Sequence, residues 1–265
     1  MPHDHHHHEH HHDGLADMLD LDAVVLHEFH AGIVAWVREH VPAPGTVVDI
    51  GAGTGAGTFE LLAQYPQATV VAVDSSEEML RRLKHKAHSD RVRTVLADLD
   101  AGWPGELPAP DLVWATNSMH HMADPVRVLR GIRDALAPGG ALALLEIEGF
   151  PRFLGPGDEL EERIHAAIAR RRAVDMPHLG GDWGAALRSA GFEIRAERRF
   201  TADLSEPPLE ATRRYAQASF ERVRENADLT PEDVKAVDAL LEALPRRDDL
   251  TVHAERLGWI AVREA

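Results

Sequence analysis

Residues Val47 to Thr58 read VVDIGAGTGAGT, in which an apolar run and one acid precede a glycine at every second position. Glycine has no Cβ and tolerates positive φ, so a turn built this way brings the backbone close to a ligand. In open parallel sheets, ligands bind beyond the carboxyl ends of the strands. The stretch therefore predicts a ligand site at the end of a buried strand, and it leaves open which ligand the glycines admit.

Outward from this turn, short β-rich runs alternate with helical patterns. The runs are TVVDI, TVVAVD, RVRTVLAD, DLVWAT and ALALLEIE, and helical patterns include residues 59–64, 76–88 and 125–137. Apolar strands without period-two polarity, each followed by a helix, are typical of a parallel sheet with helices on both faces. Two longer strands, 192–200 and 251–262, close the sheet. We predict an α/β fold: a Rossmann-like, doubly wound, seven-stranded sheet, mostly parallel with the last strand antiparallel.

The helical segments outside this alternation define the expected domain organisation. We expect one domain over residues 15–265, and helical insertions that form a cap over the strand ends, because each insertion returns the chain to the sheet. The residues 21–40 have the apolar period of one amphipathic helix. The expected core covers about 41–149 and 182–265, and the expected cap covers 15–40, 150–181 and 205–248.

The first 14 residues have an unusual composition. They contain eight of the eighteen histidines in the chain and offer almost no apolar residue to anchor them. Imidazole clusters bind transition metals, but this segment has no fixed ligand geometry. We therefore expect residues 1–14 to be a disordered, His-rich tail with incidental metal affinity.

Composition limits the partners. The chain has 28 Lys and Arg against 44 Asp and Glu, a formal net charge of −16, which repels phosphate backbones and anionic lipid. Nucleic acid and membrane partners are therefore not expected. The absence of cysteine excludes disulfides, thiolate metal sites and cysteine nucleophiles. No apolar run approaches the roughly 20 residues that span a bilayer, so we expect a cytoplasmic protein; a homo-oligomer is compatible with the sequence.

The glycine turn fits two classes of ligand. Gly51, Gly53 and Ala56 match the permissive dinucleotide pattern G-x-G-x-x-A. Asp74 follows at the spacing of an acid that holds ribose hydroxyls. An NAD(P)-dependent oxidoreductase is therefore one interpretation of the sequence.

Two acids favour another ligand. Asp49 lies two residues before Gly51, where a carboxylate would repel a pyrophosphate and suit a cation. Asp98 ends the third predicted strand and offers an acceptor for an exocyclic amine, with the Leu99 amide nearby as a donor. The ligand is thus predicted to combine a positive charge with an amino-bearing ring.

These motifs together resemble the class I S-adenosylmethionine-dependent methyltransferases. The resemblance runs from about Val41 to the carboxyl terminus and rests on VVDIGAGTG, AVDSSEEML, VLADLD, DLVWATNSMHHMADP, and VLRGIRDALAPGGALALLE followed by GFEI. It implies S-adenosyl-L-methionine as the cofactor. The residues that the resemblance assigns to its binding are Asp49, Gly51, Ala52, Gly53, Gly55, Asp74, Ser75, Met79, Asp98, Leu99 and Asn117.

The resemblance also implies a role for several of these residues. Asp49 would orient the methionine amino group, Asn117 would touch the methionine part, and Asp74 would accept both ribose hydroxyls. Asp98 and Leu99 would read the adenine. Structural alternatives stay open, because Asp49 could cap the next helix and Asp98 could initiate a turn. Met79, which would pack on the adenine, could equally be ordinary core packing.

The implied reaction is in-line methyl transfer to a small-molecule acceptor, which we expect to be a secondary metabolite. His120 and His121 follow the fourth predicted strand and are candidate catalytic bases; the alternative is that they only pack the loop. ATNSMHHM lacks the carboxylates of the family's magnesium-dependent members, so we predict no catalytic metal. Candidate acceptor-binding residues are Phe29, His30, His178 and Tyr215. A further alternative is a non-catalytic protein that binds cofactor, or metal through its histidine tail.

Overall fold

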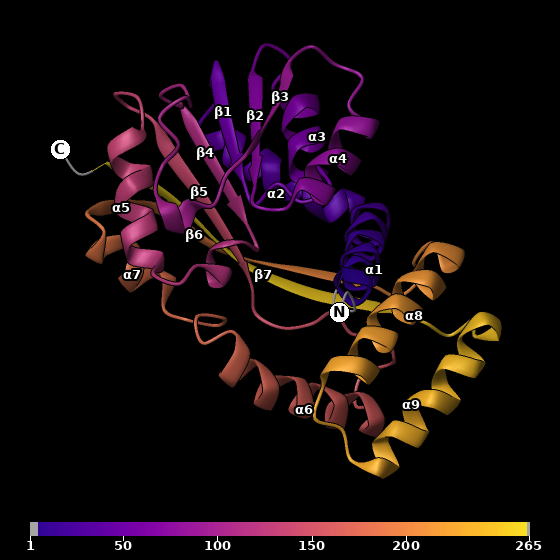
Figure 1. The fold of residues 1–265 in the computed structure, drawn as a ribbon. Coiled ribbons are helices and arrows are strands. Elements are labelled where there is room, and N and C mark those ends of the chain that lie inside the picture. The colour runs from indigo at the N-terminus through magenta and orange to yellow at the C-terminus, as the bar shows by residue number, and fades with distance from the viewer. Residues whose placement is uncertain (1–4, 264–265) are drawn as a thin grey trace. The chain divides into compact units, whose positions relative to one another are not determined.

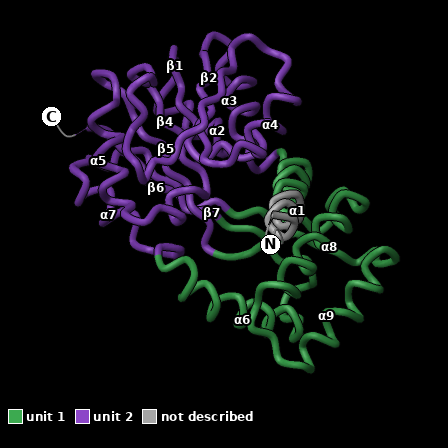
Figure 2. Tube along the Cα trace, in the orientation of Figure 1, with its two compact units in different colours: residues 1–27, 149–177, 201–255 green, residues 28–148, 178–200, 256–265 purple. Residues whose placement is uncertain are grey.

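A computed structural model describes the backbone of residues 5–263 and the side chains of residues 14–263. The chain divides into two compact units (Figure 2). Unit 1 consists of Met1–His27, Gly149–Pro177 and Thr201–Glu255, within the described residues. Unit 2 consists of the described residues of Glu28–Glu148, His178–Phe200 and Arg256–Ala265.

The sheet has the predicted topology. Seven strands follow the order β3-β2-β1-β4-β5-β7-β6 (Figure 1). The first five pair in parallel, and β7 pairs antiparallel with β5. The strand order reverses beside β1, where a ligand site is expected in a doubly wound sheet. The strands are β1 Thr46–Ile50, β2 Thr69–Asp74, β3 Val92–Leu96, β4 Leu112–Thr116, β5 Ala141–Ile147, β6 Phe192–Leu204 and β7 Val252–Arg263.

Helices cover both faces of this sheet in unit 2. Alternate strand residues point to opposite faces, so Val47 and Leu112 pack with α2 and α3, whereas Val48 and Val113 pack with α5 and α7. Leu83 of α4 packs against Ala72, on the face that carries α3. Each large apolar side chain buried this way stabilises the fold by roughly 1.5–3 kcal/mol. The helices are α2 His27–His40, α3 Ala56–Gln64, α4 Glu77–Lys86, α5 Pro125–Ala135 and α7 Trp183–Ser189.

Three 3₁₀ turns, η1 Leu99–Ala101, η2 Met119–His121 and η3 Leu244–Arg246, complete the described elements. Asp124 caps the start of α5, because its carboxylate accepts a hydrogen bond from the Arg127 amide at 3.0 Å. None of the described helices is long and apolar enough to cross a membrane.

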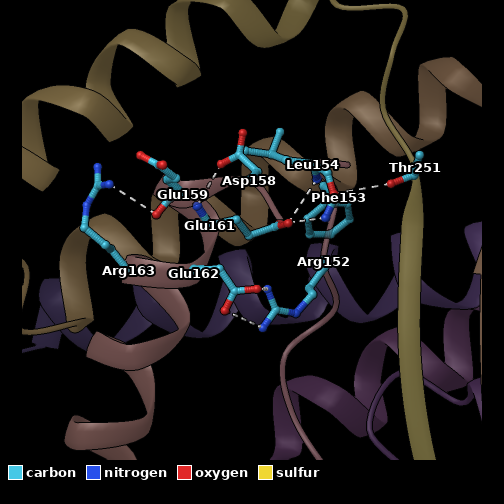
Figure 3. Close-up of polar contacts among 9 residues, drawn as sticks. All are labelled: Arg152, Phe153, Leu154, Asp158, Glu159, Glu161, Glu162, Arg163 and Thr251. Carbon is cyan, nitrogen blue, oxygen red and sulfur yellow. Dashed lines mark hydrogen bonds and ion pairs between the residues drawn. The ribbon is translucent and has the colours of Figure 1, made fainter. Parts of the chain in front are cut away.

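Unit 1 contains the remaining helices, α1 His5–Val25, α6 Glu159–Asp175, α8 Leu209–Asn226 and α9 Pro231–Ala243. A buried acid organises the start of α6 (Figure 3): Glu161 accepts hydrogen bonds from the amides of Phe153 and Leu154 at 2.7 and 3.2 Å. Phe153 in turn packs edge-on against Tyr215 of α8, with ring centroids 5.0 Å apart. The insert that precedes α6 is therefore fixed to the helical core of unit 1.

The amino-terminal helical region differs from the prediction. The single helix predicted over residues 21–40 is interrupted at Leu26, because α1 packs within unit 1 whereas Ile33 and Val37 of α2 pack on the sheet of unit 2. Residues 28–40 therefore belong with the core unit, where a cap segment was predicted.

The predicted tail also has a different boundary. The α1 helix begins at His5, inside the segment expected to be disordered. Residues 1–4 and the side chains of residues 5–13 lie outside the described part of the chain, so disorder and metal affinity of the tail stay predictions. The single-domain organisation and the cap over the strand ends likewise stay predictions.

Candidate active site

The glycine turn after β1 meets the loop after β4. Gly51, Gly53 and Gly55 have φ values of 65°, 53° and 98°, which L side chains rarely adopt. A Cβ placed on Gly51 would lie 2.3 Å from the Cβ of Ser118. The two loops therefore approach each other at a distance that only glycine permits, at the carboxyl ends of neighbouring strands.

Asp49 lies beneath this turn and is only 2% exposed. The Thr58 hydroxyl, in the first turn of α3, donates a hydrogen bond to the Asp49 carboxylate at 2.6 Å. The pKa of Asp49 is raised to about 7, mainly by burial and in smaller part by the negative charge of Asp74, against the lowering effect of Thr58. This contact links Asp49 to the first turn of α3, although no side chain caps the start of that helix. The role at the methionine amino group stays a prediction. Its electrostatic reason is that a buried carboxylate is unfavourable unless a positive charge lies nearby, and an ammonium group would supply that charge.

Asp74 ends β2 and holds the glycine turn. One carboxylate oxygen accepts from the Gly53 amide and the other from the Ser76 amide, both at 2.8 Å. A carboxylate oxygen has two lone pairs, so each one still has capacity for a hydroxyl donor. Asp74 is half-buried and Ser75 beside it is exposed, an arrangement that fits the predicted contact with two ribose hydroxyls.

The predicted adenine-binding residues show contacts that also fit their structural alternatives. The Asp98 carboxylate caps η1 by accepting from the Asp100 amide at 2.8 Å, and Asp98 is exposed. Leu99 is buried in the core and Met79 is 5% exposed on α4. Ala52, whose amide donates to the Val73 carbonyl at 3.1 Å, is a small buried residue as the turn requires. The adenine contacts of these residues stay predictions.

Hydrogen-bonding capacity is left unused at the ends of β1 and β4. Asn117 has a φ of 52°, and its side-chain oxygen is buried without a partner. Among the described side chains, eight have a buried nitrogen or oxygen atom without a partner, and five of these lie in the glycine turn, β4 or the loop that follows it. Those five are Thr54, Trp114, Thr116, Asn117 and Ser118.

Buried polar atoms in folded proteins nearly always have partners, so a concentration of unpaired ones indicates the place of a polar ligand. The residues present therefore fit a cofactor with amino, carboxylate and hydroxyl groups. Sequence reasoning identified Asn117 and missed Thr54, Thr116 and Ser118, for which the only available signal was their place beside the predicted turn.

A buried acid holds the histidine loop. Glu146, near the end of β5, accepts from the Met119 amide at 2.9 Å and contacts Nδ1 of His120 at 2.6 Å. Both side chains of the pair are less than 5% exposed. This contact assigns the proton to Nδ1 of His120 in the neutral form and leaves Nε2 as the acceptor. Sequence reasoning missed Glu146, although an acid inside the apolar run ALALLEIE was a usable signal.

His121 has different surroundings: it is exposed, and its ring centroid lies 4.2 Å from that of His120. The loop-packing alternative thus accounts for the contacts of His120, and a base role for either histidine stays a prediction. Among residues 14–263, no three His, Asp or Glu side chains are arranged to hold a metal ion.

The predicted acceptor-binding residues fall in both units. Phe29 and His30 are half-buried on α2, with ring centroids 5.9 Å apart, and the carbonyl of His178 accepts from the Gly181 amide. Tyr215 is buried in unit 1, where its hydroxyl donates to Asp22 at 2.6 Å. Core packing accounts for Tyr215, and acceptor contacts for all four residues stay predictions.

Comparison with known proteins gives the family. Residues 48–142 match a family model described as a methyltransferase domain. Trans-aconitate 2-methyltransferase of Acidovorax ebreus is 37% identical over 212 residues, which are 78% of this chain and 78% of that protein. Three other curated methyltransferases align over 57%, 44% and 40% of their own lengths, so the chain spans about half the length of these relatives.

Solved structures share the fold. A candidate type II methyltransferase of Anaeromyxobacter dehalogenans matches with a TM-score of 0.58 and 21% identity, over 88% of this chain and 95% of that chain. Phosphoethanolamine N-methyltransferase 2 of Haemonchus contortus, in complex with phosphomonomethylethanolamine and S-adenosylhomocysteine, matches with a TM-score of 0.53 and 18% identity, over 88% and 52%. From its sequence relatives and its fold, the chain belongs to the class I S-adenosylmethionine-dependent methyltransferases.

Proposed function

We propose that this protein transfers the methyl group of S-adenosylmethionine to a carboxylate oxygen of a small organic acid. The concentration of buried, unpartnered polar atoms at the ends of β1 and β4 carries the proposal of a bound cofactor. Two relatives are named for acidic acceptors, trans-aconitate and the malonyl group of an acyl-carrier protein, which supports a carboxylate as the methylated group. That the acid is a secondary metabolite, and that the protein is cytoplasmic, are finer proposals.

The cofactor, when bound, supplies an electrophilic methyl group on a positively charged sulfur. The chain's own residues then have three tasks. Asp74 accepts hydrogen bonds from vicinal hydroxyls while its contact with the Gly53 amide keeps the glycine turn in place. The side-chain oxygen of Asn117 accepts a hydrogen bond from the ammonium group. The buried carboxylate of Asp49 contributes a negative field beneath this positive charge.

A carboxylate acceptor changes what the histidines need to do. A carboxylic acid has lost its proton well below neutral pH, so its oxygen attacks without a general base. Positioning and exclusion of water then supply the rate. We therefore propose that the contact between Glu146 and His120 positions the loop after β4. A base role for His120 or His121 would be useful only for an alcohol, phenol or amine acceptor, which must lose a proton during or after attack.

Turnover tests the proposed function. The full-length chain is incubated with methyl-labelled S-adenosylmethionine and four acceptors: trans-aconitate, a malonyl thioester, a phenol and a primary amine. We expect labelled methyl ester from the first two only. Transfer to the phenol or amine alone would overturn the carboxylate assignment, and S-adenosylhomocysteine binding without any turnover would favour the non-catalytic alternative. Family membership leaves no support for the oxidoreductase alternative.

Replacement of Asp74 by alanine tests the site itself. The variant loses a charged acceptor of ribose hydroxyls and frees the Gly53 amide, so we expect S-adenosylhomocysteine to bind roughly 30- to 100-fold more weakly by calorimetry. Asp111→Ala is the matched control. The Asp111 carboxylate also accepts from two backbone amides, those of Gly45 and Thr46, but at the amino ends of the strands. Equal losses in both variants would show that the effect is general destabilisation.

A further inference from the structure

One edge of the sheet ends in a strand whose outer side pairs with no described strand. β6, Phe192–Leu204, is last in the strand order and has β7 as its neighbour among the described strands. Its residues 192–200 belong to unit 2. An edge strand presents backbone N–H and C=O groups to which another strand can bind. The strand contains no proline or glycine, the residues that interrupt such pairing.

The side chains of residues 192–200 divide between the two faces of the sheet. On one face, apolar side chains from Phe192 to Phe200 pack in the core of unit 2. The other face carries four exposed side chains that alternate in charge, Glu193, Arg195, Glu197 and Arg199. Arg195 contacts Glu193 at 3.0 Å, and their side chains are 57% and 47% exposed. The row of charges therefore lies on one face and is accessible to solvent.

This row of charges is complementary to its own reverse. Two copies of β6 that pair antiparallel about a two-fold axis at Ala196 place Arg195 of each copy opposite Glu197 of the other. The same register places Glu193 opposite Arg199. Opposite charges that face each other across an antiparallel ladder attract, so all four exposed charges gain a partner of opposite sign.

The charges also distinguish this register from its neighbours. A two-fold axis at Arg195 would place that arginine opposite its own copy and Glu193 opposite Glu197. An axis at Glu197 would place that glutamate opposite its own copy and Arg195 opposite Arg199. Both alternatives bring like charges together, which is unfavourable across a ladder. Of these three registers, the one centred on Ala196 alone pairs opposite charges throughout.

The charge of this edge differs from that of the whole chain. Charged side chains on an edge strand often keep a second copy away, which requires charges that repel their own copy. Residues 193–199 carry two Glu and three Arg, in a chain whose formal net charge is −16. The edge is therefore nearly balanced where the chain is strongly acidic, so repulsion between two copies is small at this surface.

We infer that the outer edge of β6 is the contact surface between two copies of this chain, which pair antiparallel about Ala196 and join their sheets. The partner is a second copy because the complementary sequence is that of the strand itself. A contact limited to one strand is small beside the roughly 1,200–2,000 Å² of a stable interface, so the dimer is expected to dissociate on dilution. The inference does not depend on the identity of the methyl acceptor.

Sedimentation equilibrium of the full-length chain between roughly 5 and 300 µM tests the inference. We expect the mean mass of the wild type to rise with concentration from 29.2 kDa toward twice that value. Arg195→Glu and Glu197→Arg each turn the two inner ion pairs of the dimer into like-charge pairs, so each should weaken association roughly 10- to 100-fold. The inner pairs are chosen because Arg199 also forms an ion pair with Glu148.

An equimolar mixture of these two variants gives the sharper result. In the mixed dimer, both inner positions again carry opposite charges, so the mixture should associate about as strongly as the wild type. Arg93→Glu is the matched control, because Arg93 is an exposed arginine of β3, the strand at the other edge of the sheet. It should associate within about twofold of the wild type.

Three results would contradict the inference: a wild type that keeps the mass of one chain at every concentration, association that neither reversal weakens, or a mixture that stays monomeric although both variants unfold cooperatively. Where a reversal variant does not fold, Arg195→Gln and Glu197→Gln take its place. They remove the attraction without adding repulsion, so each should weaken association roughly three- to tenfold. Association of these glutamine variants that equals that of the wild type would also count against the β6 edge.

Discussion

Replacement of Gly51 by alanine is expected to abolish detectable S-adenosylhomocysteine binding and to lower the free energy of unfolding by about 3 kcal/mol. Gly51 has a φ of 65°, which costs an alanine about 1–2 kcal/mol. The new Cβ would also lie 2.3 Å from the Cβ of Ser118, so the glycine turn and the loop after β4 must move apart. That movement displaces Asn117, the neighbour of Ser118, together with its unpartnered oxygen.

Calorimetry and urea unfolding measure the two effects, and a second substitution separates their causes. Ser118→Gly removes the obstructing carbon, so the Gly51→Ala/Ser118→Gly double variant should regain part of the stability and some cofactor affinity. Gly131→Ala in α5 is the control, because no heavy atom lies within 4 Å of its ideal Cβ; it should be neutral or slightly stabilising. Full affinity in Gly51→Ala would show that the turn does not contact the cofactor.

The fold was largely predictable because its signals are local. Apolar runs such as TVVAVD predict buried parallel strands wherever they stand, and the structure has a strand at Thr69–Asp74. The boundary signals were equally local: the helix predicted to follow Asp124 begins at Pro125, as the preference of proline for the first turn suggests. The break at Leu26 had no such signal. The residues on each side keep a helical period, and only their packing in different units separates them.

The site was predictable in position but less so in contacts. Parallel strands bring their carboxyl ends to one edge, so Asp49, Asp74 and Asn117 could be grouped from the sequence alone. The direction of each side chain depends on tertiary packing. Asp49 was predicted to face the ligand. In the structure its carboxylate accepts a hydrogen bond from Thr58, and both side chains are buried. This burial, which makes the charged form of Asp49 unfavourable, could not be read from the sequence. The pairing of Glu146 in β5 with His120 in η2 joins residues that are 26 positions apart, which no local pattern reports.

Replacement of Asp49 by asparagine is expected to remove a pH dependence from the stability of the cofactor-free protein. The pKa of Asp49 is about 7 in the folded chain against 3.8 for an ordinary aspartate. The folded state therefore binds the proton more tightly than the unfolded state, and stability falls as the pH rises from about 4 to about 7. The loss is constant above that range and amounts to about 4 kcal/mol, since each pH unit of difference is worth about 1.4 kcal/mol.

Urea unfolding between pH 4 and 8 checks this expectation through the difference between wild type and variant, in which the titration of other groups cancels. The two proteins should be equally stable near pH 4, and Asp49→Asn should be the more stable near pH 8. Asp111→Asn, which changes a carboxylate that accepts backbone amides at the amino ends of the strands, is the control for the replacement of a carboxylate by an amide. A constant difference at all pH values would mean that Asp49 stays ionised in the folded protein.

We propose that the same carboxylate favours a positive charge in the cofactor site, so the variant that gains stability should lose affinity. A bound cation favours the ionised form of Asp49, and binding to the wild type between pH 6 and 7 should therefore release a fraction of a proton, measurable in buffers of different ionisation enthalpy. Asp49→Asn should release none and bind S-adenosylhomocysteine roughly tenfold or more weakly near pH 8. Unchanged affinity would mean that Asp49 has only a structural role, which is to accept the hydrogen bond from Thr58 at the start of α3. Reduced affinity with higher stability at pH 8 would instead show that the buried charge of Asp49 destabilises the fold and strengthens cofactor binding.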